Sequence, residues 1–468
     1  MADSILKWTV DANSFLWGPY CLIGLLCLTG LWFTLILKGV QVTRFGTAVK
    51  RLLGDFSFFG VTAGKDGMSS FQALATAIAA QVGTGNLVGA VTALIAGGPG
   101  AIFWMWIAAF LGMATIFAEA CLAQLYRTTD QNGHVVGGPA YYISKGLGDN
   151  FLSKAMAAFF AVALILALGF MGNMVQANSI TDAFVTAFGF SRLLVGVVLA
   201  LLAGMIFVGG ISRIAAVTEK IVPFMAILYV VVGGVIIIKN FDQIPMVFSS
   251  IFHGAFNAQS VWGGVLGISV AQVARYGIAR GLFSNEAGMG STPHAHAAAK
   301  VKHPVEQGVL GIVSVFIDTF IVLNITVFAV LSSNTIVFEN GQPTLRGIAL
   351  VQQAFSQSLL GSYGHAFIAM CLLFFAFSTI IGWYYFAETN IRYLFGVRAL
   401  RPFQVLVMAF ILAGSVLKID LVWELADFFN GVMVFPNLLA LLFLSGKVVR
   451  LLKEYNEGIP YNRESFLK

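Results

Sequence analysis

The chain has 468 residues, of which 58% are hydrophobic and only 10% are charged, and its formal net charge is +6. Soluble domains carry roughly 25% charged residues, so the chain has too few charges to coat the about three soluble domains that its length would otherwise suggest. A mean hydropathy of +0.87 also excludes a disordered chain, and without a domain-sized basic face a nucleic-acid-binding protein is not expected. We therefore predict an all-α integral membrane protein.

Eleven apolar runs are long enough to cross a bilayer, which needs about 20 apolar residues per helix. They lie at 14–37, 69–96, 100–125, 153–186, 193–211, 215–238, 262–298, 307–333, 362–395, 402–418 and 421–446. The first run is too long for a signal peptide and lacks a basic start, so we expect it to remain in the mature protein. The run 262–298 is uneven because it contains Arg275 and Arg280. The stretches 240–261 and 340–358 are amphipathic, and we expect them to be connections.

Lys and Arg residues are distributed unequally over the predicted loops. If the N-terminus lies outside, 20 of them are cytoplasmic and 5 are external, with Arg275 and Arg280 left in the uneven run. Cytoplasmic loops are enriched in Lys and Arg. This bias predicts a multi-pass protein of the cell (plasma or inner) membrane, with an external N-terminus and a cytoplasmic C-terminus. The loops are too short for a nucleotide-binding domain, so we do not expect an ATP-driven pump.

The run 69–96 contains the segment 80–86 (AQVGTGN), in which Gly83 and Gly85 are followed by Asn86. Each glycine costs about 1 kcal/mol relative to Ala inside a helix, so we expect the helix to break here. A break frees amide groups at a helix N-terminus, where the dipole favours an anion, and carbonyl groups that suit a small cation. The alternative is a packing notch between helices. A dinucleotide-binding motif is excluded because the third glycine falls one place late and no strand precedes it.

A second break is predicted in the segment 282–293 (LFSNEAGMGSTP). Gly288 and Gly290 are again followed by a small polar residue, Ser291, 205 positions after the first break. Interrupted helices in corresponding places of two repeats are the best sequence indication of a secondary transporter's binding site. The matched pair therefore favours a binding site over a packing notch.

The ninth run contains the adjacent hydroxyl residues Ser378 and Thr379, in the segment 374–383 (FFAFSTIIGW). Such residues usually bond back to carbonyl groups of their own helix. They can also supply two oxygens to an ion. The residues alone favour the bond back to the helix.

Acidic residues inside a membrane are functional candidates by default, and six residues in or near the predicted spans are the candidates here. They are Glu119, Asp182, Glu286, Asp318, Glu388 and Asp427. Glu286 lies at the second break, where it could form a gate with Arg280 or Arg275. Asp182 and Asp427 lie near span ends, where solvation is the simpler explanation.

Together these features resemble the alanine or glycine:cation symporter family, sodium-coupled amino-acid carriers with the leucine-transporter type of fold. The resemblance covers nearly the whole chain and rests on 80–86 (AQVGTGN), 97–101 (GGPGA) and 281–288 (GLFSNEAG). It implies ten helices in a five-plus-five inverted repeat, with one extra N-terminal helix. The expected parts are the extra helix and its cytoplasmic connection at 1–66, the first repeat at 67–240, the second repeat with its amphipathic outer connections at 241–446, and a basic cytoplasmic tail at 447–468.

The resemblance also implies the residues of two sites. The sodium ligands would be the carbonyl groups of Ala79, Val82 and Phe375 and the hydroxyl groups of Ser378 and Thr379. For this hydroxyl pair, the resemblance therefore overrides the interpretation that it only bonds back to its own helix. The substrate site would comprise Thr84, Gly85, Asn86, Asn173, Gln176, Phe283, Ser284, Asn285 and Trp383. The amides of Thr84 and Gly85 would meet the substrate carboxylate, and Trp383 would limit the pocket to a small side chain. For Asn173 and Gln176, a hydrogen bond between helices is an equally good explanation.

We therefore expect a sodium-coupled secondary active symporter that imports a small neutral amino acid, alanine or glycine, by alternating access. Sodium is the co-transported ion that we expect, and neither ATP nor a nucleic acid is an expected partner. Proton coupling with Glu286 as the carrier is the nearest alternative, and a channel is an alternative from another class. An enzyme is not expected, because the sequence has neither a Ser–His arrangement nor a His-Glu-x-x-His motif.

Overall fold

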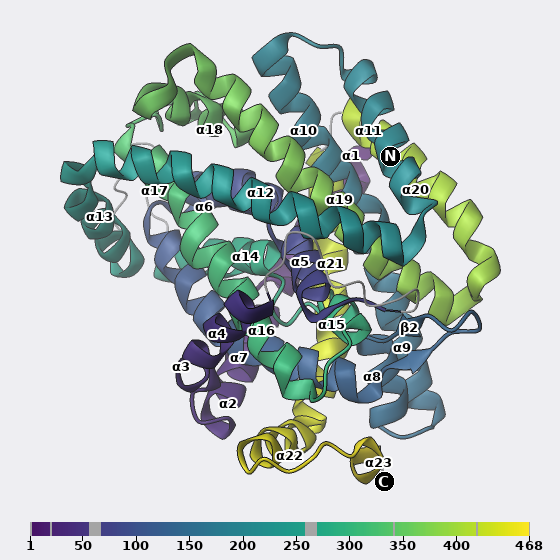
Figure 1. Cartoon of the computed structure of the whole chain (residues 1–468). Coiled ribbons are helices and arrows are strands. Elements are labelled where there is room, and N and C mark those ends of the chain that lie inside the picture. The colour runs from purple at the N-terminus through teal and green to yellow at the C-terminus, as the bar shows by residue number, and fades with distance from the viewer. Residues whose placement is uncertain are drawn as a thin grey trace.

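The computed structural model describes residues 2–18, 21–55, 67–257, 269–339, 342–417 and 420–467, and Figure 1 shows them as a bundle of crossing helices. In this part of the chain, strands form only two short antiparallel pairs. They are β1 (Thr128–Thr129) with β2 (Val135–Val136), and β3 (Phe338–Glu339) with β4 (Gln342–Pro343). In the first pair Thr128 lies opposite Val136, and in the second Phe338 lies opposite Pro343. The expected all-α architecture is confirmed.

The N-terminal region differs from the expectation of one span at 14–37. Its helices are α1 (Ala2–Leu16), α2 (Leu22–Ile36), α3 (Val40–Thr43) and α4 (Phe45–Asp55). The predicted run is therefore divided between two helices, since Leu16 is followed in the sequence by Gly18 and Pro19, which do not continue a helix. Helix α1 packs against α21 (Asp420–Phe443). The predicted connection at 56–66 lies outside the described residues.

The region predicted as the first repeat contains ten helical segments, two of which have π geometry. They are α5 (Ser70–Gln81), the π-helical turn η1 (Gly85–Gly89), α6 (Ala90–Gly97), α7 (Gly100–Tyr126), α8 (Pro139–Gly146), α9 (Phe151–Leu164), the π-helical η2 (Ile165–Gly172), α10 (Asn173–Phe188), α11 (Arg192–Phe207) and α12 (Gly210–Lys239). Single π turns inside α-helices are frequent at functional sites, and η1 follows directly on the predicted first break.

The second half has the same mixture of long and interrupted helices. Its segments are η3 (Phe241–Gln243), α13 (Ile244–Phe256), α14 (Val270–Asn285), α15 (Pro293–Ala298), α16 (Pro304–Val315), η4 (Phe316–Leu323), α17 (Asn324–Ser332), α18 (Gly347–Phe355), η5 (Ser356–Leu360), η6 (Gly361–Tyr363), α19 (Gly364–Phe395), η7 (Val397–Ala399), α20 (Leu400–Val416), α21, α22 (Ser445–Asn456) and α23 (Arg463–Leu467). Of these, η4 and η5 are π-helical, whereas η3, η6 and η7 are 3₁₀ turns.

Within the described residues, seven helices are long and apolar enough to cross a membrane, or eight if the bent pair formed by α5 and the segment 85–97 is one span. The three other predicted runs correspond to α2, to α11 and to the interrupted pair α14 and α15. Helices α2 and α11 are apolar but have only 15 and 16 residues. Residues 262–268 of the uneven run lie outside the described part. The total of eleven spans therefore stays a prediction.

The outer helices carry large apolar side chains on their exposed surfaces. On α11 and α12 these residues are Leu193, Leu194, Val197, Val198, Leu201, Leu202, Met205, Phe224, Ile227, Val230, Val231, Val235 and Ile238. Apolar patches of this extent are rare on soluble monomers. They suit helices that face lipid.

Helices α5 and α14 begin with the same local structure. Ser69 caps α5 in a reciprocal capping box with Gln72, and Ser269 caps α14 in the same way with Gln272. Each box satisfies amide groups at the helix start, and each helix ends at one of the predicted breaks. We propose from this similarity that α5 and α14 open the two repeats, at 67–240 and 241–446.

The close approach of α12 to α17 can be tested with two adjacent glycines of α12. A Cβ atom at Gly233 would lie 2.2 Å from Ile325 Cγ2, whereas a Cβ atom at Gly234 would meet no atom within 4 Å. Overpacking costs about 1–3 kcal/mol. We expect Gly233→Ala to lower the melting temperature of the purified protein in detergent and Gly234→Ala to leave it unchanged. Equal melting temperatures for the two variants would contradict this packing.

Candidate functional site

The first helix break lies where the glycine pattern predicts it. Helix α5 ends at Gln81, Val82 adopts an extended conformation, and the segment 85–97 continues at an angle of 45°. The amide of Gly83 donates to Asn86 Oδ1 (3.0 Å), and the amide of Thr84 donates to Gln176 Oε1 on α10 (3.2 Å). The freed amide groups are therefore bonded to side-chain oxygens rather than to a continuing helix.

The five oxygens of the predicted sodium site gather between the end of α5 and the middle of α19. Thr379 Oγ1 lies 3.0 Å from Ala79 O, 3.3 Å from Val82 O and 3.0 Å from Phe375 O. Ser378 Oγ lies 3.3 Å from Ala79 O and 2.9 Å from Phe375 O. Both hydroxyls thus bond back to their own helix, as their residue types suggest, and also contact carbonyl groups of α5.

Glycine allows this contact between α5 and α19. A Cβ atom at Gly83 would lie 2.4 Å from Thr379 Oγ1 and 3.1 Å from Gln176 Oε1. Any larger residue at position 83 would therefore push apart the oxygens of Thr379 and α5.

The second break also lies at the predicted glycines. Glu286 ends α14 in the left-handed conformation (φ 57°), and Gly288 and Gly290 have φ values of 90° and 82°. Both glycine amides donate to the carboxylate of Glu119 on α7, each at 3.0 Å. Asn437 on α21 donates to the same carboxylate at 2.7 Å. Glu119 therefore fixes the loop between α14 and α15 by accepting hydrogen bonds from its backbone.

Asp318, on the π-helical segment η4, connects the two breaks. Its Oδ1 accepts from Asn86 Nδ2 at the first break (2.6 Å) and from Ser284 Oγ at the second (3.0 Å), and its Oδ2 accepts from Thr319 Oγ1 (2.8 Å). Gln81 adds a direct link, because its Nε2 donates to Asn285 O (2.7 Å). The polar groups of both breaks therefore form one buried network.

The six candidate acidic residues fall into two groups. Asp182 pairs with Arg192, Glu388 with Arg392, and Asp427 with Arg280. Glu119, Glu286 and Asp318 are fully buried, and in the described part of the chain their bonds come from neutral donors. A buried carboxylate is costly unless its charge is compensated, which makes these three the members of the six best suited to a cationic ligand.

The expected pairing of Glu286 with Arg280 is wrong. Arg280 Nη2 lies 2.7 Å from Asp427 Oδ2, and its guanidinium group stacks over Trp423. Glu286 instead accepts hydrogen bonds from Ser291 Oγ and Trp383 Nε1. Positions 280 and 286 point about 120° apart around a helix, and the left-handed turn at Glu286 directs its carboxylate towards α19. Arg280 remains a gate candidate, with Asp427 as its partner.

Aromatic side chains lie between this ion pair and the second break. Phe283 meets Trp383 edge to face, with centroids 5.9 Å apart, and lies 5.7 Å from Trp423. Trp383 is buried, and its ring would collide with a Cβ atom at Gly172 of η2. Trp383 therefore lies beside the breaks, as expected, but its indole is held by Glu286.

Several buried polar atoms around the first break have no hydrogen-bond partner among the described residues. They are Thr84 Oγ1, Gln81 Oε1 and Asn173 Oδ1. The Asn173 amide nitrogen bonds back to Gly169 O, whereas Gln176 bonds to the first break. Unpaired buried polar atoms are rare in native structures. They indicate hydrogen-bonding capacity for a polar ligand here.

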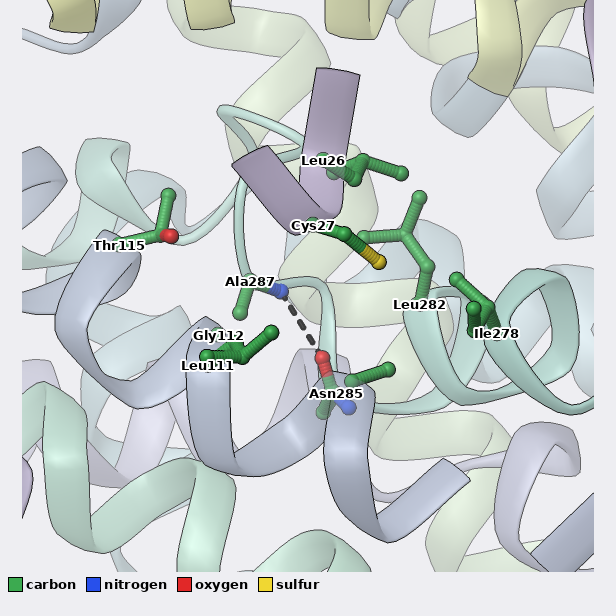
Figure 2. A pocket seen from close by; sticks show the side chains of 10 residues that line it. Leu26, Cys27, Leu111, Gly112, Thr115, Ile278, Leu282, Asn285 and Ala287 are labelled. Atoms are coloured by element: carbon green, nitrogen blue, oxygen red, sulfur yellow. Dashed lines mark hydrogen bonds between the residues drawn. The ribbon is translucent and has the colours of Figure 1, made fainter. Parts of the chain in front are cut away.

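A small cavity adjoins the second break between α2, α7 and α14. Figure 2 shows Cys27, Thr115 and Asn285 around it, with the Asn285 side chain accepting from the amide of Ala287. Its volume is about 20 Å³, which holds about one water molecule. It is too small for an amino acid, so we do not assign the substrate to it.

Sequence reasoning missed the structural roles of Asp318, Glu119 and Gln81. Asp318 and Glu119 were recognisable as acidic residues in apolar runs, but their partners come from helices that are distant in the sequence. Gln81 is separated from Asn285 by 204 positions. No periodicity in the sequence indicates such a contact.

The comparisons with known proteins agree with this geometry. The sequence matches the Sodium:alanine symporter family over residues 2–466. It is 42% identical over 445 residues to the Sodium/alanine symporter AgcS of Methanococcus maripaludis, covering 95% of this chain and 96% of that protein. It is also 42% identical over 445 residues to the Probable sodium/glutamine symporter GlnT of Bacillus subtilis, covering 95% and 89%.

Among solved structures, MhsT in complex with L-phenylalanine matches with a TM-score of 0.58 at 14% identity, covering 83% of this chain and 99% of that one. At this identity the likeness shows the fold alone, which is the leucine-transporter type. The family match covers nearly the whole chain, and the family consists of transporters rather than enzymes. The chain therefore belongs to the sodium:alanine symporter family and is a multi-pass membrane protein of amino-acid:cation symport.

Proposed function

We propose that this protein imports a small neutral amino acid, alanine or glycine, together with sodium. The observation that carries the proposal is the cluster of five oxygens from Ala79, Val82, Phe375, Ser378 and Thr379, with the hydroxyls 2.9–3.3 Å from the carbonyl oxygens. Carbonyl groups freed by a helix break are typical sodium ligands in transporters of this kind. If the two hydroxyl hydrogens rotate away from the carbonyl groups, the five oxygens are free to accept an ion.

The substrate carboxylate would approach the first break. There the amides of Thr84 and Gly85 begin a new helical segment, whose dipole favours negative charge. Gln176 Oε1 accepts from the Thr84 amide, so binding requires the Gln176 side chain to turn away. The unpaired Thr84 Oγ1 and Asn173 Oδ1 provide a further donor and acceptor. The sodium ion would then stabilise the carboxylate, because charges attract strongly at low dielectric constant.

The size of the site favours a small side chain. A Cβ atom at Gly85 would lie 2.8 Å from Ser284 Cα, so the two breaks approach closely. Phe283, Asn285 and Trp383 would line the remaining sides of the site. One relative is named a probable sodium/glutamine symporter. The largest substrate side chain that this protein accepts should therefore be measured directly.

Transport would follow from opening one side of the site at a time. In the orientation predicted from the Lys and Arg distribution, with an external N-terminus and a cytoplasmic C-terminus, the Arg280–Asp427 pair lies on the outer side of the breaks. On the inner side, Arg392 pairs with Asp130 and Glu388, both at 2.6 Å. If the outer ion pair and the inner ion pairs separate in turn, the site opens to one side of the membrane at a time, which is alternating access.

Replacement of Thr379 tests the sodium site. Thr379→Ala removes one of the five oxygens, so we expect the sodium concentration for half-maximal alanine uptake into proteoliposomes to rise by about tenfold or more. Thr389→Ala is the matched control in α19, because the Thr389 hydroxyl is also buried and bonds back to its helix, to Tyr385 O. A wild-type sodium response in Thr379→Ala would refute the proposed ion site.

Asp318 supplies negative charge between the breaks, where sodium and the substrate ammonium group bring positive charge. Hydrogen bonds to charged groups contribute about 1.5–3 kcal/mol, so we expect Asp318→Asn to reduce uptake at subsaturating alanine by about tenfold to a hundredfold. Asp182→Asn, at a half-exposed ion pair, removes the same charge and should transport normally. Near-normal uptake by Asp318→Asn would remove Asp318 from the site.

Proton coupling is the second candidate because Glu286 is a buried carboxylate at a break and receives only neutral donors in the described part of the chain. Sodium and pH gradients should therefore be imposed separately on proteoliposomes. We expect uptake to follow the sodium gradient and Glu286→Gln to keep this dependence. Uptake driven by a pH gradient without sodium, and abolished in Glu286→Gln, would favour proton coupling instead.

A further inference from the structure

A second cavity lies far from the helix breaks, where the C-terminal end of α2 and the α3–α4 junction meet α22. Its volume is about 610 Å³. One part of its wall is apolar and consists of Ile36, Leu37, Val449 and Leu452. Figure 1 places α22 below α2 and α3, at the end of the bundle that carries the C-terminus.

The polar part of the wall carries a net positive charge. It contains three basic side chains, Lys38, Arg44 and Lys453, and one acidic side chain, Glu457. Glu457 lies 3.9 Å from Lys453 and both are largely exposed, so this pair is weak. Arg44 is hydrogen-bonded to the neutral Asn456, and Lys38 forms no ion pair within the described part of the chain. Among the described residues, the charges of Lys38 and Arg44 are therefore not matched by an acidic partner.

An exposed apolar stripe leads along α2 to this cavity. Leu28, Leu31, Trp32 and Leu35 are 45–66% exposed, and their spacing places them on one face of the helix. The stripe ends one residue before Ile36, the first residue of the cavity wall. On the other side, α22 buries Val448, Leu451 and Leu452 and exposes Lys453. An apolar stripe that ends in a basic cavity matches the two parts of a phospholipid.

We propose that this cavity binds the headgroup phosphate of an anionic phospholipid, with the acyl chains lying along the exposed stripe of α2. Basic pockets at the cytoplasmic ends of membrane helices are suited to anionic headgroups, and each nearby Lys or Arg strengthens binding. The orientation predicted from the loop charges places this cavity at the cytoplasmic leaflet. Lipid binding here is independent of the ion or amino acid that the protein transports.

Native mass spectrometry of the purified full-length protein tests the site with phosphatidylglycerol and phosphatidylcholine as probes. We expect the wild type to retain phosphatidylglycerol in preference to phosphatidylcholine. The triple variant Lys38→Gln, Arg44→Gln, Lys453→Gln should bind phosphatidylglycerol about a hundredfold more weakly, at roughly fivefold for each charge removed. Glu457→Gln removes the one carboxylate that the described residues contribute to the cavity wall, and it should strengthen binding about fivefold.

The matched control removes three other basic residues on the same predicted side of the membrane: Lys154→Gln, Arg398→Gln and Arg401→Gln. These side chains are exposed and do not line the cavity, so this variant should bind phosphatidylglycerol like the wild type. Equal losses in the two triple variants would show a diffuse charge effect and overturn the site. Glycerol 3-phosphate that competes as well as the lipid would show a site for free phosphate esters and overturn the lipid assignment. If the first triple variant does not fold, an unchanged affinity in Glu457→Gln overturns the proposal.

Discussion

The structure depends on one constraint: backbone groups released at a helix break inside a membrane must find partners within the protein. At the first break, Asn86 and Gln176 accept from the freed amides, and the hydroxyl of Thr379 contacts the freed carbonyl groups. At the second break, Glu119 accepts from both glycine amides. Asn86 belongs to the broken segment itself, and the other partners come from the surrounding helices α7, α10 and α19.

The two breaks are satisfied by chemically different groups. The partners at the first break are neutral amides and hydroxyls, whereas the loop of the second break is held by a carboxylate. Hydrogen bonds to charged groups contribute about 1.5–3 kcal/mol, compared with about 0.5–1.5 kcal/mol for neutral pairs. The first break can therefore exchange its protein partners for ligands more readily than the second. Asp318 joins the two breaks, since it accepts hydrogen bonds from Asn86 and Ser284. A movement of one break would therefore alter the hydrogen bonds of the other.

Close helix contacts explain part of the high glycine content. At Gly83 and Gly85 a side chain would enter the space of Thr379 and Ser284. Without these glycines, α5 could not approach α19 and α14 closely enough for the polar groups to meet. The glycine that breaks the helix thus also brings the partners of the break within hydrogen-bonding distance.

The sequence by itself determined the membrane class, most of the spans, both breaks and the hydroxyl pair, because apolar length and glycine spacing are local properties of the chain. The family resemblance also implied that Ala79, Val82, Ser378 and Thr379 lie close together, and in the structure they are neighbours. Only the tertiary structure decided the partners of the charged residues: Arg280 pairs with Asp427 rather than Glu286, and Glu119 and Asp318 hold the breaks. These contacts join residues up to 318 positions apart. Which side chains meet across such separations depends on how the helices pack. Hydrophobic periodicity does not determine this packing.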